Sequence, residues 1–196
     1  MSTPRITIVR HAETAWSLSG QHTSHTDLAI TPEGRENVAG LRRVLAVDEF
    51  ARVFTSPLRR ARETCEVAGF GEVAEDRAEL AEWDYGEYEG RTTADIRVDE
   101  PGWSLWADGA PGGETPGQVA VRVDRFVAEL RACDGEVLVF SHGHLSRVLA
   151  ARWIGLPVAT GQSFVLGTGS ISVLGDDRGT PVIERWNDAG HLDGQP

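Results

Sequence analysis

The sequence predicts a single-domain α/β fold, in which strands and helices alternate along the chain. Short runs rich in apolar and β-prone residues, over 6–9, 51–54 and 137–140, have the length expected of buried strands. Longer stretches between them, over 31–46 and 117–131, carry apolar residues at helical spacing. In such folds, ligands bind beyond the carboxyl ends of the strands, so the residues that follow each strand are candidate site residues.

The length and composition describe one globular domain over residues 1–196, with a variable tail after about 188. A chain of 196 residues with 40% hydrophobic and 25% charged residues can bury a sizeable core. Its net charge of −11 argues against nucleic acid and anionic membrane surfaces as partners. Any anion site must then be built from local arginines.

The sequence contains no evident membrane segment or targeting signal. No run approaches the ~20 apolar residues of a transmembrane helix, and residues 1–5 contain no apolar signal region. Cys65 and Cys133 lie far apart, which does not suggest a disulfide framework. We therefore expect a cytoplasmic protein whose two cysteines are small core residues.

The first strand ends at a residue pair suited to phosphate chemistry. Ile6–Val9 leads straight into Arg10 and His11, which fall where the strand ends. Arg10 offers a fork of donors for phosphate or carboxylate, and His11 a ring nitrogen that can attack or pass a proton near neutral pH. Taken alone, such a pair is more often a loop salt bridge and a satisfied histidine.

A later strand ends in the same way, which changes this assessment. The run Val137–Phe140 is followed directly by Ser141, His142, Gly143 and His144. Two strands that each deliver a histidine at the carboxyl end favour a shared site.

The segments Arg10-His11-Ala12-Glu13-Thr14 and Ser141-His142-Gly143 resemble the histidine phosphatase superfamily, the phosphoglycerate-mutase-like group. The resemblance covers roughly residues 5–174 and implies a three-layer sandwich, with a mostly parallel central sheet flanked by helices. The first motif of that family usually has glycine where this chain has Ala12. The added methyl would restrict the loop if this position needed a positive φ.

The polar loop over 16–27 would by itself be an ordinary surface loop. In the family the corresponding segment borders the phosphate pocket, and Ser17, Thr23 and Ser24 each offer a hydroxyl or amide donor for phosphate oxygen. The pattern resembles a branch of small sugar-phosphate and broad phosphatases, which carry serine at the Ser17 position where the mutases carry asparagine.

The next elements predict a helix, a strand and a second helix. Thr31 and Pro32 are typical of the first positions of a helix that runs to about residue 46. After the strand over 51–54, we expect Ser56 to cap a helix that carries several arginines, which in isolation could be a solvated face. The resemblance instead assigns Arg60, in its first turn, to phosphate binding.

An aromatic, acidic and glycine-punctuated segment over 80–90 follows a short strand predicted near 72–74. Such a segment could serve only as a charge-balancing wall. In the family, the glutamate at the Glu82 position is the proton donor, and the match continues through Tyr85, which could close the substrate side with its hydroxyl.

The last third of the chain predicts the remaining elements. Residues 101–116 form a Gly/Pro-rich loop that could be a lid or a packing insertion. Beyond it we expect helices over 117–131 and 144–153. Closing strands are expected over 163–166, 171–174 and 182–185.

The resemblance implies a role for each candidate residue. His11 would be the nucleophile, and Glu82 would protonate the leaving oxygen and then activate water to cleave a phosphohistidine. Arg10 and Arg60 would supply fixed positive charge and His142 a further hydrogen bond to phosphate. The backbone amides of Gly143 and His144 would add donors at the start of a helix.

No metal or cofactor is expected. The pair His142 and His144, and the pair His22 and His25, lack cysteine or carboxylate companions at ligand spacing. The arginines supply the charge screening that a metal would otherwise provide.

The function that these residues favour is a phosphomonoesterase acting on small phosphorylated metabolites, sugar phosphates among them. The first alternative is a 2,3-bisphosphoglycerate-dependent phosphoglycerate mutase, which has a longer chain with insertions that exclude water. The second is a catalytically inactive phosphate-binding module, which the retention of the candidate catalytic residues disfavours. The sequence leaves the physiological substrate open and is compatible with a homo-oligomer.

Overall fold

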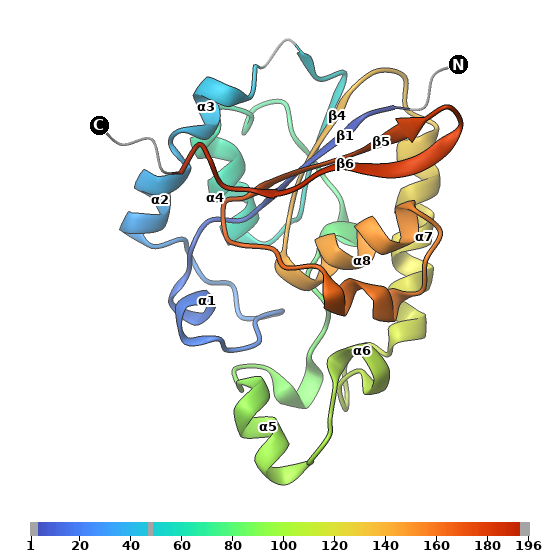
Figure 1. Ribbon diagram of the computed structural model, residues 1–196. Coiled ribbons are helices and arrows are strands. Elements are labelled where there is room, and N and C mark those ends of the chain that lie inside the picture. Colours follow the sequence, from blue (N-terminus) through green and yellow to red (C-terminus); the bar gives the residue numbers. More distant parts are fainter. Residues whose placement is uncertain (1–3, 47–48, 193–196) are drawn as a thin grey trace.

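The computed structural model describes residues 4–46 and 49–192, and it shows the expected three-layer α/β sandwich (Figure 1). The described residues contain one six-stranded sheet in the order β3-β2-β4-β1-β5-β6. Its strands are β1 (Ile6–Arg10), β2 (Arg52–Thr55), β3 (Glu75–Asp76), β4 (Val137–Ser141), β5 (Ile171–Asp177) and β6 (Thr180–Asp188). β1 to β4 run parallel, and β5 and β6 complete one edge in antiparallel pairing.

Helices cover both faces of this sheet. The α-helices are α1 (Ala15–Ser19), α2 (Pro32–Val38), α3 (Leu41–Val44), α4 (Arg59–Val67), α5 (Thr93–Asp99), α6 (Leu105–Asp108), α7 (Pro116–Arg131) and α8 (Gly143–Trp153). Short 3₁₀ helices span η2 (Ala78–Leu80), η3 (Gly86–Tyr88) and η4 (Val158–Ser163). Figure 1 shows α2, α3 and α4 on one side of the sheet and α7 and α8 on the other.

The two central strands divide their side chains between the two layers. Ile8 of β1 and Val139 of β4 point into the core beneath α7 and α8. Val9 and Phe140, one position further along, point into the core beneath α2 and α4. Because both faces are covered, these strands are continuous apolar runs, as parallel sheets require.

The pairing of these two strands sets the position of the site. β1 and β4 run parallel with Arg10 opposite Ser141. The next residues, His11 and His142, therefore leave the sheet together at its carboxyl edge, and the His11 amide donates to the Ser141 carbonyl at 2.8 Å.

Several predicted helices are confirmed at their starts. Thr31 caps α2 by accepting from the amide of Gly34, with Pro32 at the first turn, as expected. The predicted helix over 31–46 is nevertheless divided into α2 and α3 around Gly40. A Cβ at Gly40 would lie 2.7 Å from the carbonyl oxygen of His191, so the backbone near His191 packs closely against this turn.

Three local predictions were wrong. The helix after β2 begins at Arg59, with Leu58 and not Ser56 at its N-cap. The short strand near 72–74 lies instead at Glu75–Asp76. Residues 163–166 are not a strand, and the Val165 carbonyl accepts from the indole of Trp186 instead of from a neighbouring strand.

The segment that precedes α7 is a packing insertion. Trp103 and Trp106 pack into the core, and Trp106 meets Trp83 edge to face at 5.7 Å. Gly86 has φ +47°, and a Cβ there would lie 2.2 Å from the Pro111 carbonyl oxygen. Residues 84–90 and 111–114 thus pack backbone against backbone, which fixes the loop that carries Glu82.

The remaining expectations concern the ends of the chain. Over residues 4–46 and 49–192, no helix is both long and apolar enough to cross a membrane. Leu192 packs against the core beneath α2, so the predicted variable tail is ordered up to this residue. Residues 193–196 of that tail lie outside the described part of the chain.

Candidate active site

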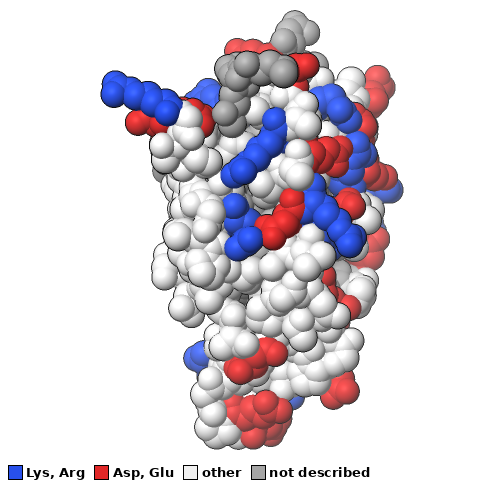
Figure 2. Space-filling view, turned by 90° about the vertical axis from the view of Figure 1, so that its right-hand side faces the viewer, with Lys and Arg blue, Asp and Glu red and all other residues white. Residues whose placement is uncertain are grey.

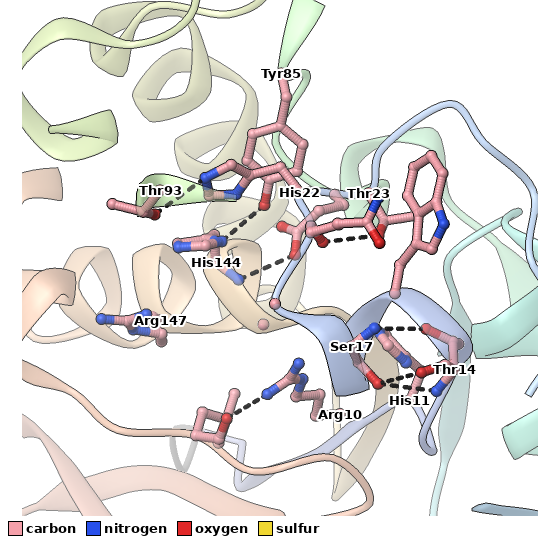
Figure 3. A pocket seen from close by; sticks show the side chains of 16 residues that line it. Arg10, His11, Thr14, Ser17, His22, Thr23, Tyr85, Thr93, His144 and Arg147 are labelled. Atoms are coloured by element: carbon pink, nitrogen blue, oxygen red, sulfur yellow. Dashed lines mark hydrogen bonds between the residues drawn. The ribbon is translucent and has the colours of Figure 1, made fainter. Parts of the chain in front are cut away.

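A pocket of about 240 Å³ opens at the carboxyl ends of β1 and β4 (Figure 3). The residues predicted for the site that line it are Arg10, His11, Ser17, Thr23, Glu82, Tyr85, Gly143 and His144. Of the other predicted residues, Arg60 and His142 lie buried behind this lining, and Ser24 points elsewhere. The structure therefore brings together side chains from four separated parts of the chain.

The ring of His11 is held in one tautomer. Its Nδ1 lies 2.7 Å from the carbonyl oxygen of Ala12, which can only accept, so Nδ1 carries the proton and Nε2 keeps its lone pair. Burial, with the nearby charges of Arg10 and Arg60, holds the pKa of His11 well below its usual value. The ring is therefore neutral and able to act as a nucleophile at neutral pH.

The alanine in the first motif fits its position. Among the described residues, the non-glycine residues with positive φ are Arg178 and Asn187, so Ala12 does not adopt the conformation that favours glycine. Its amide donates to Thr64 Oγ1 at 2.9 Å, and its methyl group packs in the core beneath α2 and α4. The substitution is therefore compatible with the loop shape.

Arg10 presents an unused donor. One terminal nitrogen of its guanidinium donates to the Leu166 carbonyl, while the buried Nε has no hydrogen-bond partner in the described part of the protein. The group lies against Gly143, where a Cβ would come within 3.3 Å of it. A buried donor without an acceptor costs about 1–3 kcal/mol, so this arrangement favours an anionic ligand.

Arg60 and His142 form a hydrogen-bonded pair behind the pocket. Arg60 Nε donates to His142 Nδ1 at 3.1 Å, and its Nη2 donates to the Thr23 carbonyl at 3.0 Å. The other ring nitrogen of His142 lies 2.7 Å from Ser56 Oγ. The ring centroids of His142 and His11 are 5.2 Å apart, so the pair is next to the candidate nucleophile.

The carboxylate of Glu82 lies at the N-terminus of α8. Its Oε1 accepts from the amides of Trp83 at 2.9 Å and Leu145 at 2.8 Å, and its Oε2 accepts from the amide of His144 at 3.1 Å. Helix N-termini favour negative charge, so this position stabilises the carboxylate. The His144 amide, predicted to bind phosphate, is bonded to Glu82 in this structure.

The three predicted hydroxyl residues of the 16–27 loop have different surroundings. Ser17 Oγ accepts from the amide of Thr14 in the capping box of α1, and Thr23 Oγ1 donates to the Gln21 carbonyl at 3.2 Å. Ser24 directs both its amide and its hydroxyl to the carboxylate of Glu89. The structure thus places Ser24 in support of the loop and away from the pocket lining.

The outer wall of the pocket was not predicted from the sequence. His22 and Arg147 line the pocket, and Tyr85 and His144 join at 2.7 Å between the tyrosine hydroxyl and Nδ1. Arg147 stacks on Trp106 with its guanidinium carbon 4.6 Å from the ring centroid. The sequence could have predicted Arg147 as a pocket residue. It follows Gly143 by four positions and His144 by three, so it shares their helix face.

The positive groups of the pocket contrast with the acidic surface. Figure 2 shows acidic side chains gathered at the end of the molecule that α5 forms. No salt bridge joins Arg10, Arg60 or Arg147 to a carboxylate among the described residues. The pocket therefore concentrates unpaired positive charge in a chain whose net charge is −11.

Comparison with known proteins gives a consistent result. Residues 6–189 match the family described as the histidine phosphatase superfamily, branch 1. An acid phosphatase of Mycobacterium tuberculosis is 41% identical over 95% of this chain and 94% of its own. A sedoheptulose 1,7-bisphosphatase of Saccharomyces cerevisiae is 38% identical over 80% of this chain and 69% of its own.

Solved structures agree with these sequence matches. The product of an open reading frame from Mycobacterium tuberculosis superimposes with a TM-score of 0.88 at 40% identity, over 94% of this chain and 97% of its own. A mycobacterial glucosyl-3-phosphoglycerate phosphatase in complex with inorganic phosphate gives a TM-score of 0.82 at 27% identity, over 96% and 99% of the two chains.

The buried histidines predict a loss of stability in acid. Burial lowers the pKa of His22 to about 4, whereas an unfolded histidine titrates near 6.5, so the unfolded chain binds the proton first. The free energy of unfolding should be level above pH 7 and fall as the pH drops from about 6.5 to 4, with His22 contributing on the order of 3 kcal/mol. Urea unfolding at pH 7.5 and 4.5 measures this fall.

His22→Gln isolates that contribution, because the amide cannot take up a proton in this range. The variant should lose less stability than the parent between the two pH values, although His11, His142 and His144 still contribute in the same direction. An equal loss in both proteins would contradict the prediction.

Proposed function

Because the chain belongs to the histidine phosphatase superfamily, we propose that this phosphatase of phosphorylated metabolites acts through a phosphohistidine formed on His11. The observation that carries the proposal is the fixed tautomer of His11, whose Nδ1–H donates to the Ala12 carbonyl. That bond leaves the lone pair of Nε2 free in a pocket with positive charge.

The first half of the reaction transfers the phosphoryl group to His11. Arg10 and Arg60 offset the negative charge that repels a nucleophile from a phosphate monoester. The Nε2–P bond forms as the ester P–O bond breaks, and the electron pair departs with the leaving oxygen. Glu82, which must be in its protonated form at this step, supplies the proton that this oxygen requires.

The second half returns the enzyme to its starting state. Glu82, now a carboxylate, takes a proton from water as the water oxygen attacks phosphorus and the N–P bond breaks. The three backbone amides that bind Glu82 stabilise this carboxylate form between the two steps. Inorganic phosphate leaves, and His11 is again neutral.

We further propose that the reaction needs no metal and takes place in the cytoplasm. The arginines and histidines beside the pocket supply the positive charge and donors that phosphoryl transfer requires. Cys65 and Cys133 are free thiols, which suits a reducing compartment.

The outer wall points to a substrate with a second anionic group. Arg147 lines the pocket, and its only described polar contacts are the carbonyls of Gly161 and Gln162. Two relatives are named for substrates of this kind, one for a bisphosphate and the other for glucosyl-3-phosphoglycerate, whose glycerate part carries a carboxylate. We propose sugar phosphates with a further phosphate or carboxylate as the substrate class, and the phosphatase names of these relatives favour hydrolysis over the mutase reaction.

The covalent intermediate can be trapped. Rapid quenching with labelled substrate should leave acid-labile, base-stable label on the peptide that contains His11. His11→Ala should abolish the label and lower kcat by on the order of 10³-fold or more, as loss of a nucleophile does. His191→Ala, a histidine outside the pocket, serves as the matched control.

The same experiment distinguishes the alternatives. Label on His142 would reverse the assignment of the two histidines, and activity without any label would indicate direct attack by water. Turnover in excess EDTA tests metal independence at the same time.

Replacing the proton donor should affect substrates unequally. Glu82→Gln should slow hydrolysis of alkyl phosphates by roughly 10²–10⁴-fold, because their leaving oxygen needs a proton, and slow activated aryl phosphates less. Comparison of kcat/KM for a sugar phosphate and p-nitrophenyl phosphate measures the difference. Glu87→Gln, on an exposed residue of the same loop, is the control, and small equal losses would assign the proton to Asp84.

The role of Arg147 can be tested through substrate charge. Arg147→Met should raise KM for a sugar bisphosphate roughly 10–100-fold, the worth of a hydrogen bond to a charged group, and change KM for p-nitrophenyl phosphate little. Arg152→Met is the matched control, since Arg152 lies on the same helix, bonds Asp124 and is outside the pocket. Equal effects on the two substrates would contradict a second anion contact.

A further inference from the structure

A buried chain of hydrogen bonds runs from Arg60 through His142 to Ser56. Arg60 Nε lies 3.1 Å from His142 Nδ1, and His142 Nε2 lies 2.7 Å from Ser56 Oγ. Ser56 and His142 are 0% exposed and Arg60 is 1% exposed, so these contacts are shielded from bulk solvent. The three groups come from the end of β2, the start of α4 and the end of β4.

The donors in this chain fix where His142 carries its proton. A guanidinium has donors only, so Nδ1 of His142 must accept with its lone pair. The neutral ring therefore carries its hydrogen on Nε2 and donates it to Ser56 Oγ. Ser56 Oγ also accepts from the amide of Leu58 at 3.3 Å, which holds the hydroxyl oxygen in place.

This tautomer leaves His142 with no donor for a substrate. Its one N–H is bonded to Ser56, and its lone pair meets Arg60. The terminal nitrogens of Arg60 already donate to the carbonyls of Thr26 and Thr23. If Arg60 binds a phosphoryl oxygen, as the proposed function requires, we therefore expect that oxygen at the Nε that now bonds Nδ1. The lone pairs of the oxygen and of Nδ1 would then face each other, which is repulsive unless a proton lies between them.

The charged surroundings explain why the proton is absent before substrate binds. The titratable and charged groups that act on the ring are Arg10 at the end of β1, His11 directly after it, Arg60 from α4 and Arg122 from α7. Burial, followed by the positive charges of the arginines, holds the pKa of His142 well below its usual value. A bound dianion reverses the sign of this field.

We propose that His142 takes up one proton at Nδ1 when the substrate phosphate binds, and that Ser56 is the positioning residue that makes this uptake possible. The proton comes from solvent, and the new Nδ1–H donates to the phosphoryl oxygen. Arg60 Nε moves its hydrogen bond from Nδ1 to that oxygen. The Nε2–H bond to Ser56 persists throughout, so the imidazolium keeps both hydrogens paired, and release of phosphate returns the proton to solvent.

Sulfate is a suitable probe for the uptake, because it stays a dianion near neutral pH and cannot bring the proton itself. Calorimetric titration with sulfate at pH 7, in two buffers with different heats of ionisation, gives the number of protons bound. We expect about one proton per sulfate in the parent protein and none in His142→Asn. Glu82→Gln and His11→Asn should retain the uptake.

The outcomes separate this proposal from the function on which it rests. Uptake that persists in His142→Asn, or that disappears only in Glu82→Gln or His11→Asn, would overturn it. Sulfate binding without any uptake would overturn it while leaving the phosphate site intact. Failure of the parent protein to bind sulfate or inorganic phosphate would refute the proposed site and this inference together.

The role of Ser56 is tested through pH profiles. Without the acceptor for Nε2–H, the imidazolium is less stable, so Ser56→Ala should move the alkaline limb of kcat to lower pH by about one unit. It should also lower kcat/KM by roughly 10–100-fold, the worth of a hydrogen bond to a charged group. Ser56→Thr keeps the hydroxyl and should restore both.

A merely structural role would give a different pattern. Ser146→Ala removes a buried hydroxyl that has no hydrogen-bond partner in the described structure, and it should leave the profile unchanged. An activity loss in Ser56→Ala at all pH values, with the alkaline limb in place, would overturn the proposal. Ser56→Cys, which weakens the acceptor at nearly constant volume, provides the same test if Ser56→Ala does not fold.

Discussion

The parallel pairing of β1 with β4 is the constraint on which the site depends. Arg10 and Ser141 are opposite each other in that pair, so the residue after each strand emerges at the same edge. The bond from the His11 amide to the Ser141 carbonyl extends the ladder by one step and fixes the separation of the two histidines. Because both faces of these strands are buried, a slip by one residue would move every side chain into the opposite core layer and disrupt the packing of both layers. The packing of the core therefore also holds the two histidines in register.

The pocket gathers positively charged groups in a chain whose net charge is −11. Arg10 and Arg60 lose hydration on burial, which lowers the pKa of each, and no carboxylate forms a salt bridge with either in the described structure. The neighbouring histidines respond by staying neutral. An unliganded site of this kind stores unfavourable energy that a dianion relieves. The Glu82 carboxyl accepts hydrogen bonds from backbone amides, and its charge acts on Arg10 and Arg60 without a direct salt bridge to either in the described structure.

The sequence predicted the parts of the fold and site that depend on order along the chain. The strands before His11 and His142, the cap at Thr31 and the apolar face of α7 are local patterns, and all were found where expected. Features that depend on contacts between distant segments were not predictable. The helix predicted over 31–46 is divided at Gly40, where the backbone of His191 lies close by, and the role of Ser56 depends on His142, which comes from a distant strand.

The close approach of Gly86 to Pro111 separates the position of Glu82 from the loop that lines the outer pocket. It joins the chain before and after α5 and α6, so residues 91–109 form a loop closed at its base. Glu82 precedes this loop, while Thr93 within it lines the outer pocket. The exposed positions of this loop can therefore vary without displacing Glu82, the proposed proton donor, while Trp103 and Trp106 keep the loop packed against the core. In this architecture, changes in the loop can alter which substrates enter the pocket while the proposed reacting residues keep their positions.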